Sequence, residues 1–157
     1  MVSKLNPIFQ DFSDRFVGGI HAANDIALPK KLSRFALNYS IESLVHVDEY
    51  LAAVRADLSQ LDKFQTELSN TMLWGGAYVG EVIRRNSQRI YEWIDYEDFM
   101  PTHISLAGVI GPRTLATCAF LWEPKCDSMC MPLNKVVRGL YEGPDNNVHF
   151  FATGWID

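Results

Sequence analysis

The chain has 157 residues, of which 48% are hydrophobic and 21% are charged. This composition is typical of a folded globular protein, and the length suits a single domain over residues 1–157 with its own buried core. The formal net charge is -5 and no run of lysine or arginine exceeds two residues, so we expect no nucleic-acid partner. No apolar run approaches the ~18 residues that a transmembrane helix needs, so we expect no membrane partner either.

The three cysteines, Cys118, Cys126 and Cys130, are an odd number, and the N-terminal residues lack the apolar core of a secretory signal. Reduced thiols in the cytoplasm are the simplest explanation. Zinc sites favour two cysteine pairs with two residues between the members, whereas Cys126 and Cys130 have three residues between them and no second pair. We therefore expect neither a metal nor another cofactor.

Helical periodicity dominates the first half of the chain. Apolar residues recur every fourth position from Ile8 onward, and the first helix is expected to end at a glycine pair or at Asn24. Ser40 is a candidate N-cap for the second helix, and Gly75-Gly76 is a candidate break in the third. The predicted helices cover about 8–24, 41–56 and 60–86.

Apolar and alternating segments dominate the second half. We expect a short strand within 32–39, later strands within 89–96 and 115–122, and a last strand in the V-H-F-F-A-T-G-W run. Pro132 is expected to begin a short helix. Because helices come first and strands later, the sequence predicts an α+β fold with N-terminal helices packed on a C-terminal antiparallel sheet.

The segment from Trp74 to Asn86 reads W-G-G-A-Y-V-G-E-V-I-R-R-N, which combines helical spacing with glycines and charges. Gly76 and Gly80 are four residues apart, so on a helix they share a face and allow another backbone to come close. This pattern predicts a buried helix in close contact with the later sheet.

Charged residues of the same segment allow two interpretations. Glu81 precedes Arg84 by three residues and Arg85 by four, the spacing of helical ion pairs. In the favoured interpretation Glu81 and an arginine brace the helix packing. In the alternative, Tyr78, Glu81 and Arg84 surround a pocket for a small molecule or substrate.

Acidic and aromatic residues alternate in the next segment, Tyr91–Phe99. Carboxylates can attract a basic partner, and aromatic side chains are common anchors in protein interfaces. A strand end followed by a solvated acidic turn is the alternative. The candidate partner-binding residues are Glu92, Trp93, Asp95, Tyr96, Glu97 and Asp98.

Three segments together resemble a group of small bacterial proteins with a G-A-Y-x-G-E-V-x-R-R signature followed by a tryptophan. The segments are Leu37–Leu51, Gly76–Asn86 with Trp93, and Pro132–Phe151. The resemblance implies a stand-alone cytoplasmic α+β domain of the immunity or antitoxin type, which neutralises a toxin. The group has Gly-Gly before the tryptophan, whereas this chain has Ser87-Gln88-Arg89.

Neither the resemblance nor any local motif identifies catalytic residues. There is no G-x-S-x-G nucleophile motif and no H-E-x-x-H motif. We therefore expect a non-catalytic cytoplasmic protein that binds a protein partner through acidic and aromatic surface. The alternative is a small-molecule binder or enzyme with its pocket around Glu81, Arg84 and Tyr78.

Overall fold

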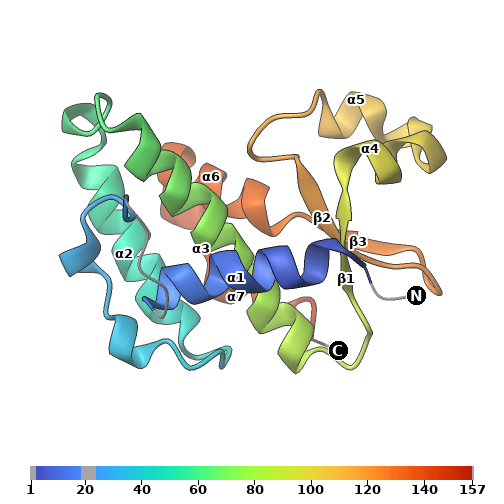
Figure 1. Ribbon diagram of the computed structural model, residues 1–157, viewed down its shortest axis with the longest axis horizontal. Helices are drawn as coiled ribbons and strands as arrows, with labels where there is room; N and C mark the ends of the chain where they lie inside the picture. Colours follow the sequence, from blue (N-terminus) through green and yellow to red (C-terminus); the bar gives the residue numbers. More distant parts are fainter. Residues whose placement is uncertain (1–2, 19–23, 157) are drawn as a thin grey trace.

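The computed structural model describes residues 3–18 and 24–156, and these form an α+β fold (Figure 1). The main helices are α1 (Leu5–Val17), α2 (Leu44–Ala56), α3 (Gln65–Asn86), α6 (Pro132–Glu142) and α7 (Val148–Thr153). The strands are β1 (Glu92–Asp95), β2 (Ala119–Glu123) and β3 (Ser128–Cys130). Short helices complete the described chain: α4 (Tyr96–Phe99), α5 (Ala107–Ile110), and the 3-10 turns Pro29–Lys31, Arg34–Ala36, Leu58–Gln60, Met100–Thr102, Ile104–Leu106 and Pro144–Asn146.

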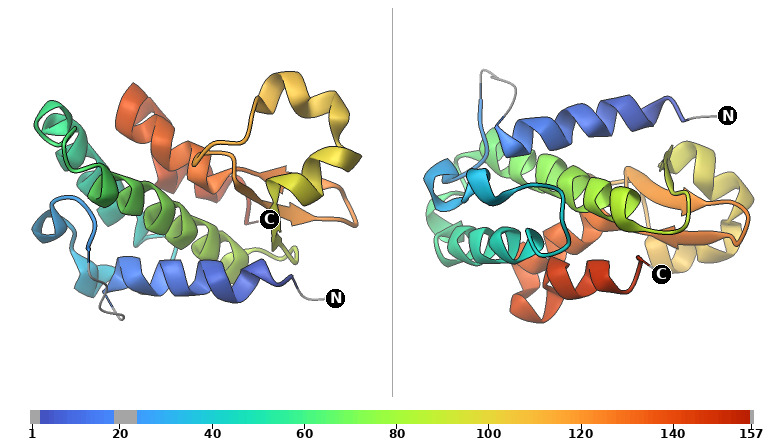
Figure 2. Two further views of the ribbon diagram at one scale, coloured as in Figure 1. Left: turned by 45° about the horizontal axis from the view of Figure 1, so that its top comes forward. Right: turned by 90° about the horizontal axis from the view of Figure 1, so that it is seen from below.

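The α+β prediction is confirmed, but the strands are not the C-terminal part of the chain. Two helices, α6 and α7, follow β3 and return to the helical side of the molecule (Figure 1). Figure 2 shows α3 in the middle of this side, with α1 on one face and α6 with α7 on the other. A helix covered from several sides must be apolar nearly all round, as α3 is along its second half.

The predicted helix boundaries differ from the observed ones at their N-terminal and C-terminal ends. Helix α1 ends at Val17, at the first of its two predicted ends and not at residue 24, because Gly18 takes a left-handed conformation (φ 95°) and its N–H closes the last turn. Residues 19–23 of the prediction lie outside the described part. Helix α2 begins at Leu44 rather than at 41, after a turn in which Ser40 Oγ accepts from the Ser43 N–H at 3.1 Å. Helix α3 begins at Gln65 rather than at 60.

Two predicted strands are wrong. The 32–39 segment contains a 3-10 turn, Arg34–Ala36, and no strand. The last apolar run forms α7, because Asn147 Oδ1 accepts from the Phe150 N–H at 2.7 Å and so caps a helix. Aromatic and β-branched residues suit strands, but this cap and the packing against α2 decide the local structure.

Helix α3 runs through its glycines without a break. A Cβ at Gly76 would lie 2.8 Å from the Cα of Leu133 in α6, and a Cβ at Gly80 would lie 2.5 Å from Cη2 of Trp93 in β1. The prediction of close packing is therefore confirmed, with one difference: only Gly80 faces the sheet, whereas Gly76 faces a helix. Both positions exclude any larger side chain.

The sheet is antiparallel in the order β1-β2-β3, with Trp93 opposite Leu121 and Leu121 opposite Cys130. Successive side chains point to opposite faces, so the sheet separates two apolar clusters. Trp93, Leu121 and Cys130 belong to the main core with the helices. The opposite face packs on the excursion between β1 and β2 through Ile94, Phe99, Met100, Phe120, Trp122 and Met129.

Candidate functional site

The acidic and aromatic segment splits into a buried half and an exposed half. Trp93 is fully buried, and its indole stacks on Phe9 with ring centroids 4.2 Å apart. Trp93 therefore belongs to the core, and its prediction as a partner-binding anchor is wrong. The strand alternation of β1 turns it inward, whereas Glu92 next to it is half-buried on the other face.

Asp95 and Tyr96 connect the sheet to the following excursion. Asp95 Oδ1 accepts from the Glu97 N–H at 2.8 Å, and its Oδ2 pairs with Arg113 at 3.3 Å. The Tyr96 hydroxyl donates to the Gly111 carbonyl at 2.8 Å. Both side chains are half-buried, so their polar groups hold the two ends of the excursion together.

Residues 96–110, which we call the 96–110 lobe, present a surface of mixed chemistry. Glu97 and Asp98 are exposed, and neither forms an ion pair with residues 3–18 or 24–156. On the same lobe, Ile104 is 74% exposed and Val109 is 85% exposed. Figure 1 shows the lobe, with α4 and α5, on the side of the sheet away from the long helices.

A histidine fastens the middle of this lobe to the β2–β3 turn. His103 Nε2 lies 2.7 Å from Asp127 Oδ1, and its Nδ1 lies 3.0 Å from the Phe99 carbonyl. Asp127 also accepts from Trp122 Nε1 at 2.9 Å, and it holds a left-handed backbone (φ 49°). Partial burial acts to lower the pKa of His103, but the hydrogen bonds to Asp127 and Phe99 outweigh it and raise that pKa above its usual value.

Glu81 is the most deeply buried carboxylate of the helical core, with 1% of the residue exposed. Its Oε2 accepts from Arg84 Nη1 at 2.8 Å and from Trp93 Nε1 at 3.0 Å. Arg84 Nε in turn donates to the Tyr91 carbonyl at 3.0 Å. The carboxylate is thus paired and hydrogen-bonded, as burial of a charge requires, and the group joins α3 to β1.

The predicted pocket around Tyr78, Glu81 and Arg84 does not form as one site. Tyr78 is fully buried, and its hydroxyl lies 2.6 Å from Ser43 Oγ and accepts from the Tyr39 N–H at 3.0 Å. Glu81 and Arg84 instead border a separate hollow of about 300 Å³ at the C-terminal end of α3. We call it the α3-end hollow; it is lined by Gln10, Glu81, Arg84, Arg85, Ser87, Gln88, Arg89, Ile90 and Tyr91.

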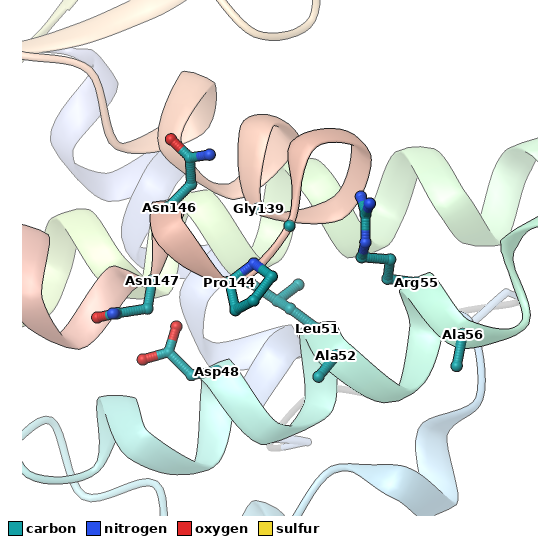
Figure 3. Close-up of a pocket in the computed structure, with 10 residues that line it drawn as sticks. Asp48, Leu51, Ala52, Arg55, Ala56, Gly139, Pro144, Asn146 and Asn147 are labelled. Carbon is teal, nitrogen blue, oxygen red and sulfur yellow. The ribbon is translucent and has the colours of Figure 1, made fainter.

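A second hollow, of about 340 Å³, lies between α2 and the α6–α7 connection (Figure 3). Asp48 and Arg55 stand near its two ends, and Leu51, Ala52 and Pro144 lie between them (Figure 3). Asp48 accepts from the N–H groups that begin α7, from Val148 at 2.7 Å and from His149 at 3.1 Å. Arg55 Nη1 donates to the Leu140 carbonyl at 3.0 Å near the end of α6.

These two charges therefore cap helix ends. Asp48 compensates the partial positive charge at the start of α7, and Arg55 compensates the partial negative charge at the end of α6. Burial raises the pKa of Asp48, although the two backbone N–H groups act to lower it. Sequence reasoning missed both residues, because their partners lie more than 80 positions away along the chain.

All three cysteines are free; Cys130 is buried, Cys118 is half-buried and Cys126 is exposed. Burial raises the pKa of the Cys118 thiol. Within residues 3–18 and 24–156, no three His, Cys, Asp or Glu side chains come together as a metal-binding group. Across the same part of the chain, no helix has the length and apolar character needed to span a membrane.

Comparisons with known proteins do not identify a family. No protein-family model matches the chain, and neither a curated protein nor a solved structure gives a significant match.

Proposed function

We propose that this protein is a non-catalytic binding protein whose 96–110 lobe receives a basic protein partner. The observation that carries the proposal is the pairing of uncompensated carboxylates, Glu97 and Asp98, with the exposed aliphatic side chains of Ile104 and Val109 on one lobe. Glu97 and Asp98 lie in the first turn of α4 and form no ion pair with the described residues, so their charges are available to a partner.

Each chemical part of the lobe suits a different step of recognition. The carboxylates, in a chain of net charge -5, attract a basic surface and speed the encounter. Burial of Ile104 and Val109 then slows dissociation, since a fully buried aliphatic side chain contributes about 1.5–3 kcal/mol. Phe99 of the lobe packs against Phe120 of β2, and this contact holds the exposed carboxylates and aliphatic side chains of the lobe in place against the sheet.

We propose further that the partner is a toxin and that the protein is a cytoplasmic inhibitor of the immunity or antitoxin type. Two observations support this finer form. The G-A-Y-x-G-E-V-x-R-R signature in α3 resembles that of small bacterial proteins of this kind. Three free thiols, including exposed Cys126, suit a reducing compartment.

Binding of purified products of the neighbouring genes, measured by biolayer interferometry, tests the proposal. We expect one of them to bind at micromolar concentration or tighter, and the double variant E97Q/D98N to slow association with a reduced dependence on salt. The double variant I104S/V109S should instead speed dissociation. The matched control is E42Q/E49Q, which removes the same charge from exposed, unpaired positions beside and on α2.

If no neighbouring product binds, or if E42Q/E49Q weakens binding as much as E97Q/D98N, the lobe is not the recognition surface. Circular dichroism spectra of all three double variants should match that of the wild type, because each replaced side chain is exposed.

A further inference from the structure

The α3-end hollow gathers positive charge in an acidic protein. Arg84, Arg85 and Arg89 all line it, whereas Glu81 is the one carboxylate among its lining residues. The hollow therefore has an excess of positive charge, although the chain as a whole carries -5. It lies at the end of α3, and none of its lining residues belongs to the 96–110 lobe.

Two of the three guanidinium groups are held in place. Arg84 is fixed by Glu81 and by the Tyr91 carbonyl, so that Nη1 and Nε are engaged and Nη2 is left over. Arg85 Cζ lies over the Tyr39 ring, 3.5 Å from its centroid, and Arg85 Nη2 donates to Gln10 Oε1 at 2.6 Å. Fixed donors lose little side-chain entropy when a ligand binds.

Arg89 is the third, and its guanidinium makes no hydrogen bond or ion pair with the described residues, 3–18 and 24–156. Its backbone is held by the N–H bond to Ser87 Oγ at 3.1 Å. Glu123 lines the neighbouring hollow together with Arg89, and its oxygens accept from the backbone N–H groups of Lys125 at 3.0 Å and Cys126 at 2.9 Å. The hydrogen bond from Cys126 lowers the pKa of Glu123 most, and the charge of Arg89 also lowers it, so the two charges attract each other without direct contact.

Arginines at the end of a helix also compensate its dipole, which explains the charge of Arg84 and Arg85. The dipole does not explain Arg89, which lies three residues beyond the end of α3 at Asn86 and lines the same hollow. The lining of the α3-end hollow has more hydrogen-bond donors than free acceptors. Besides the guanidinium groups it includes the Ser87 hydroxyl and the Gln88 amide, whereas the side-chain oxygens of Glu81 and Gln10 already accept from Arg84 and Arg85. A ligand with many acceptor oxygens and more than one negative charge matches this arrangement.

We propose that the α3-end hollow binds a compact, multiply charged oxyanion of the phosphate class, with Arg84 and Arg85 as fixed donors and Arg89 closing over the ligand. The site is independent of partner binding by the 96–110 lobe. A volume of about 300 Å³ accommodates a phosphate or diphosphate group with its water.

Isothermal titration calorimetry of the full chain with inorganic pyrophosphate, at an ionic strength held constant with sodium chloride, tests this site. We expect saturable binding of one equivalent with a Kd of about 1 mM or tighter, and weaker binding of inorganic phosphate. R89Q should weaken pyrophosphate binding about tenfold, because it removes charge-assisted hydrogen bonds.

The control is R138Q, which removes the same charge from an exposed position on α6, where Arg138 pairs with Glu142, and it should bind pyrophosphate as the wild type does. Equal unfolding midpoints for R89Q and the wild type establish that the fold is retained. The proposal is overturned if pyrophosphate gives no saturable heat, or if R138Q weakens binding as much as R89Q does.

Discussion

Substitution of Gly80 by alanine is expected to destabilise the protein, although alanine is the better helix former. A Cβ at this position would lie 2.5 Å from Cη2 of Trp93 and closer still to Cζ2. The indole cannot move away easily, because it is fully buried, stacks on Phe9 and donates to Glu81 at 3.0 Å. The helix must therefore separate from β1, or the indole must leave its hydrogen bond.

The expected change in the unfolding free energy of G80A combines two destabilising contributions and one stabilising contribution. Overpacking of a core costs about 1–3 kcal/mol, and loss of a hydrogen bond to a charged group costs about 1.5–3 kcal/mol. Higher helix propensity returns about 1 kcal/mol. The free energy of unfolding of G80A should fall by about 1.5–5 kcal/mol, and with a urea m-value of about 2 kcal/mol/M the midpoint should fall by about 1–2.5 M.

Urea unfolding followed by circular dichroism measures this change, with G108A as the matched control, since a Cβ at Gly108 meets no atom within 4 Å. W93F provides a second background, because phenylalanine lacks the fused ring that meets the new methyl group. We expect G80A to cost at least 1 kcal/mol less in the W93F background than in the wild type, in the usual range of coupling between touching residues. Equal costs in the two backgrounds, or a G80A protein as stable as G108A, would show that contact with the Trp93 indole does not restrict the side chain at position 80.

Two further predictions concern the charged groups. Because the pKa of His103 is raised in the folded state, its contribution to stability is complete below the usual pKa of 6.5 and is lost as the pH rises through the folded-state pKa. The urea midpoint of the wild type should therefore fall from pH 6 to pH 8, and that of D127N should change less over the same range. A protonated His103 imidazole donates from both ring nitrogens, from Nε2 to the Asp127 carboxylate and from Nδ1 to the Phe99 carbonyl. E81A should lose about 3–5 kcal/mol of unfolding free energy, because it leaves Arg84 and the Trp93 N–H without their buried acceptor. E81Q keeps an acceptor oxygen and should lose less; equal losses of the two variants in a urea titration would show that the charge of Glu81, and not its acceptor oxygens, carries the stabilisation.

Short sequence patterns predict the structural features whose physical cause lies within a few residues along the chain. The i,i+3 spacing of Glu81 and Arg84 predicts their ion pair, and the four-residue spacing of Gly76 and Gly80 predicts close packing on a shared helix face. The start of α6 at Pro132 also follows from a local preference for proline in the first turn.

Features that depend on distant partners could not be predicted in this way. The indole of Trp93 looks like an exposed anchor among acidic residues until the sheet register turns it toward Glu81. The final apolar run looks like a strand because of its aromatic and β-branched residues; its local cap, Asn147, was a signal for a helix, whereas the additional acceptor, Asp48, lies a hundred residues earlier in the chain. In the acidic segment, sequence alone does not separate the exposed Glu97 from the half-buried Asp95.

The central claim is that the 96–110 lobe is the recognition surface. Hydrogen–deuterium exchange of the full chain, alone and saturated with the neighbouring gene product that binds it, tests this claim most directly. We predict slower exchange in residues 96–110 and unchanged exchange in α2, which carries the control residue Glu49. Protection confined to α2 or to the hollow of Figure 3, with the lobe unchanged, would contradict the account.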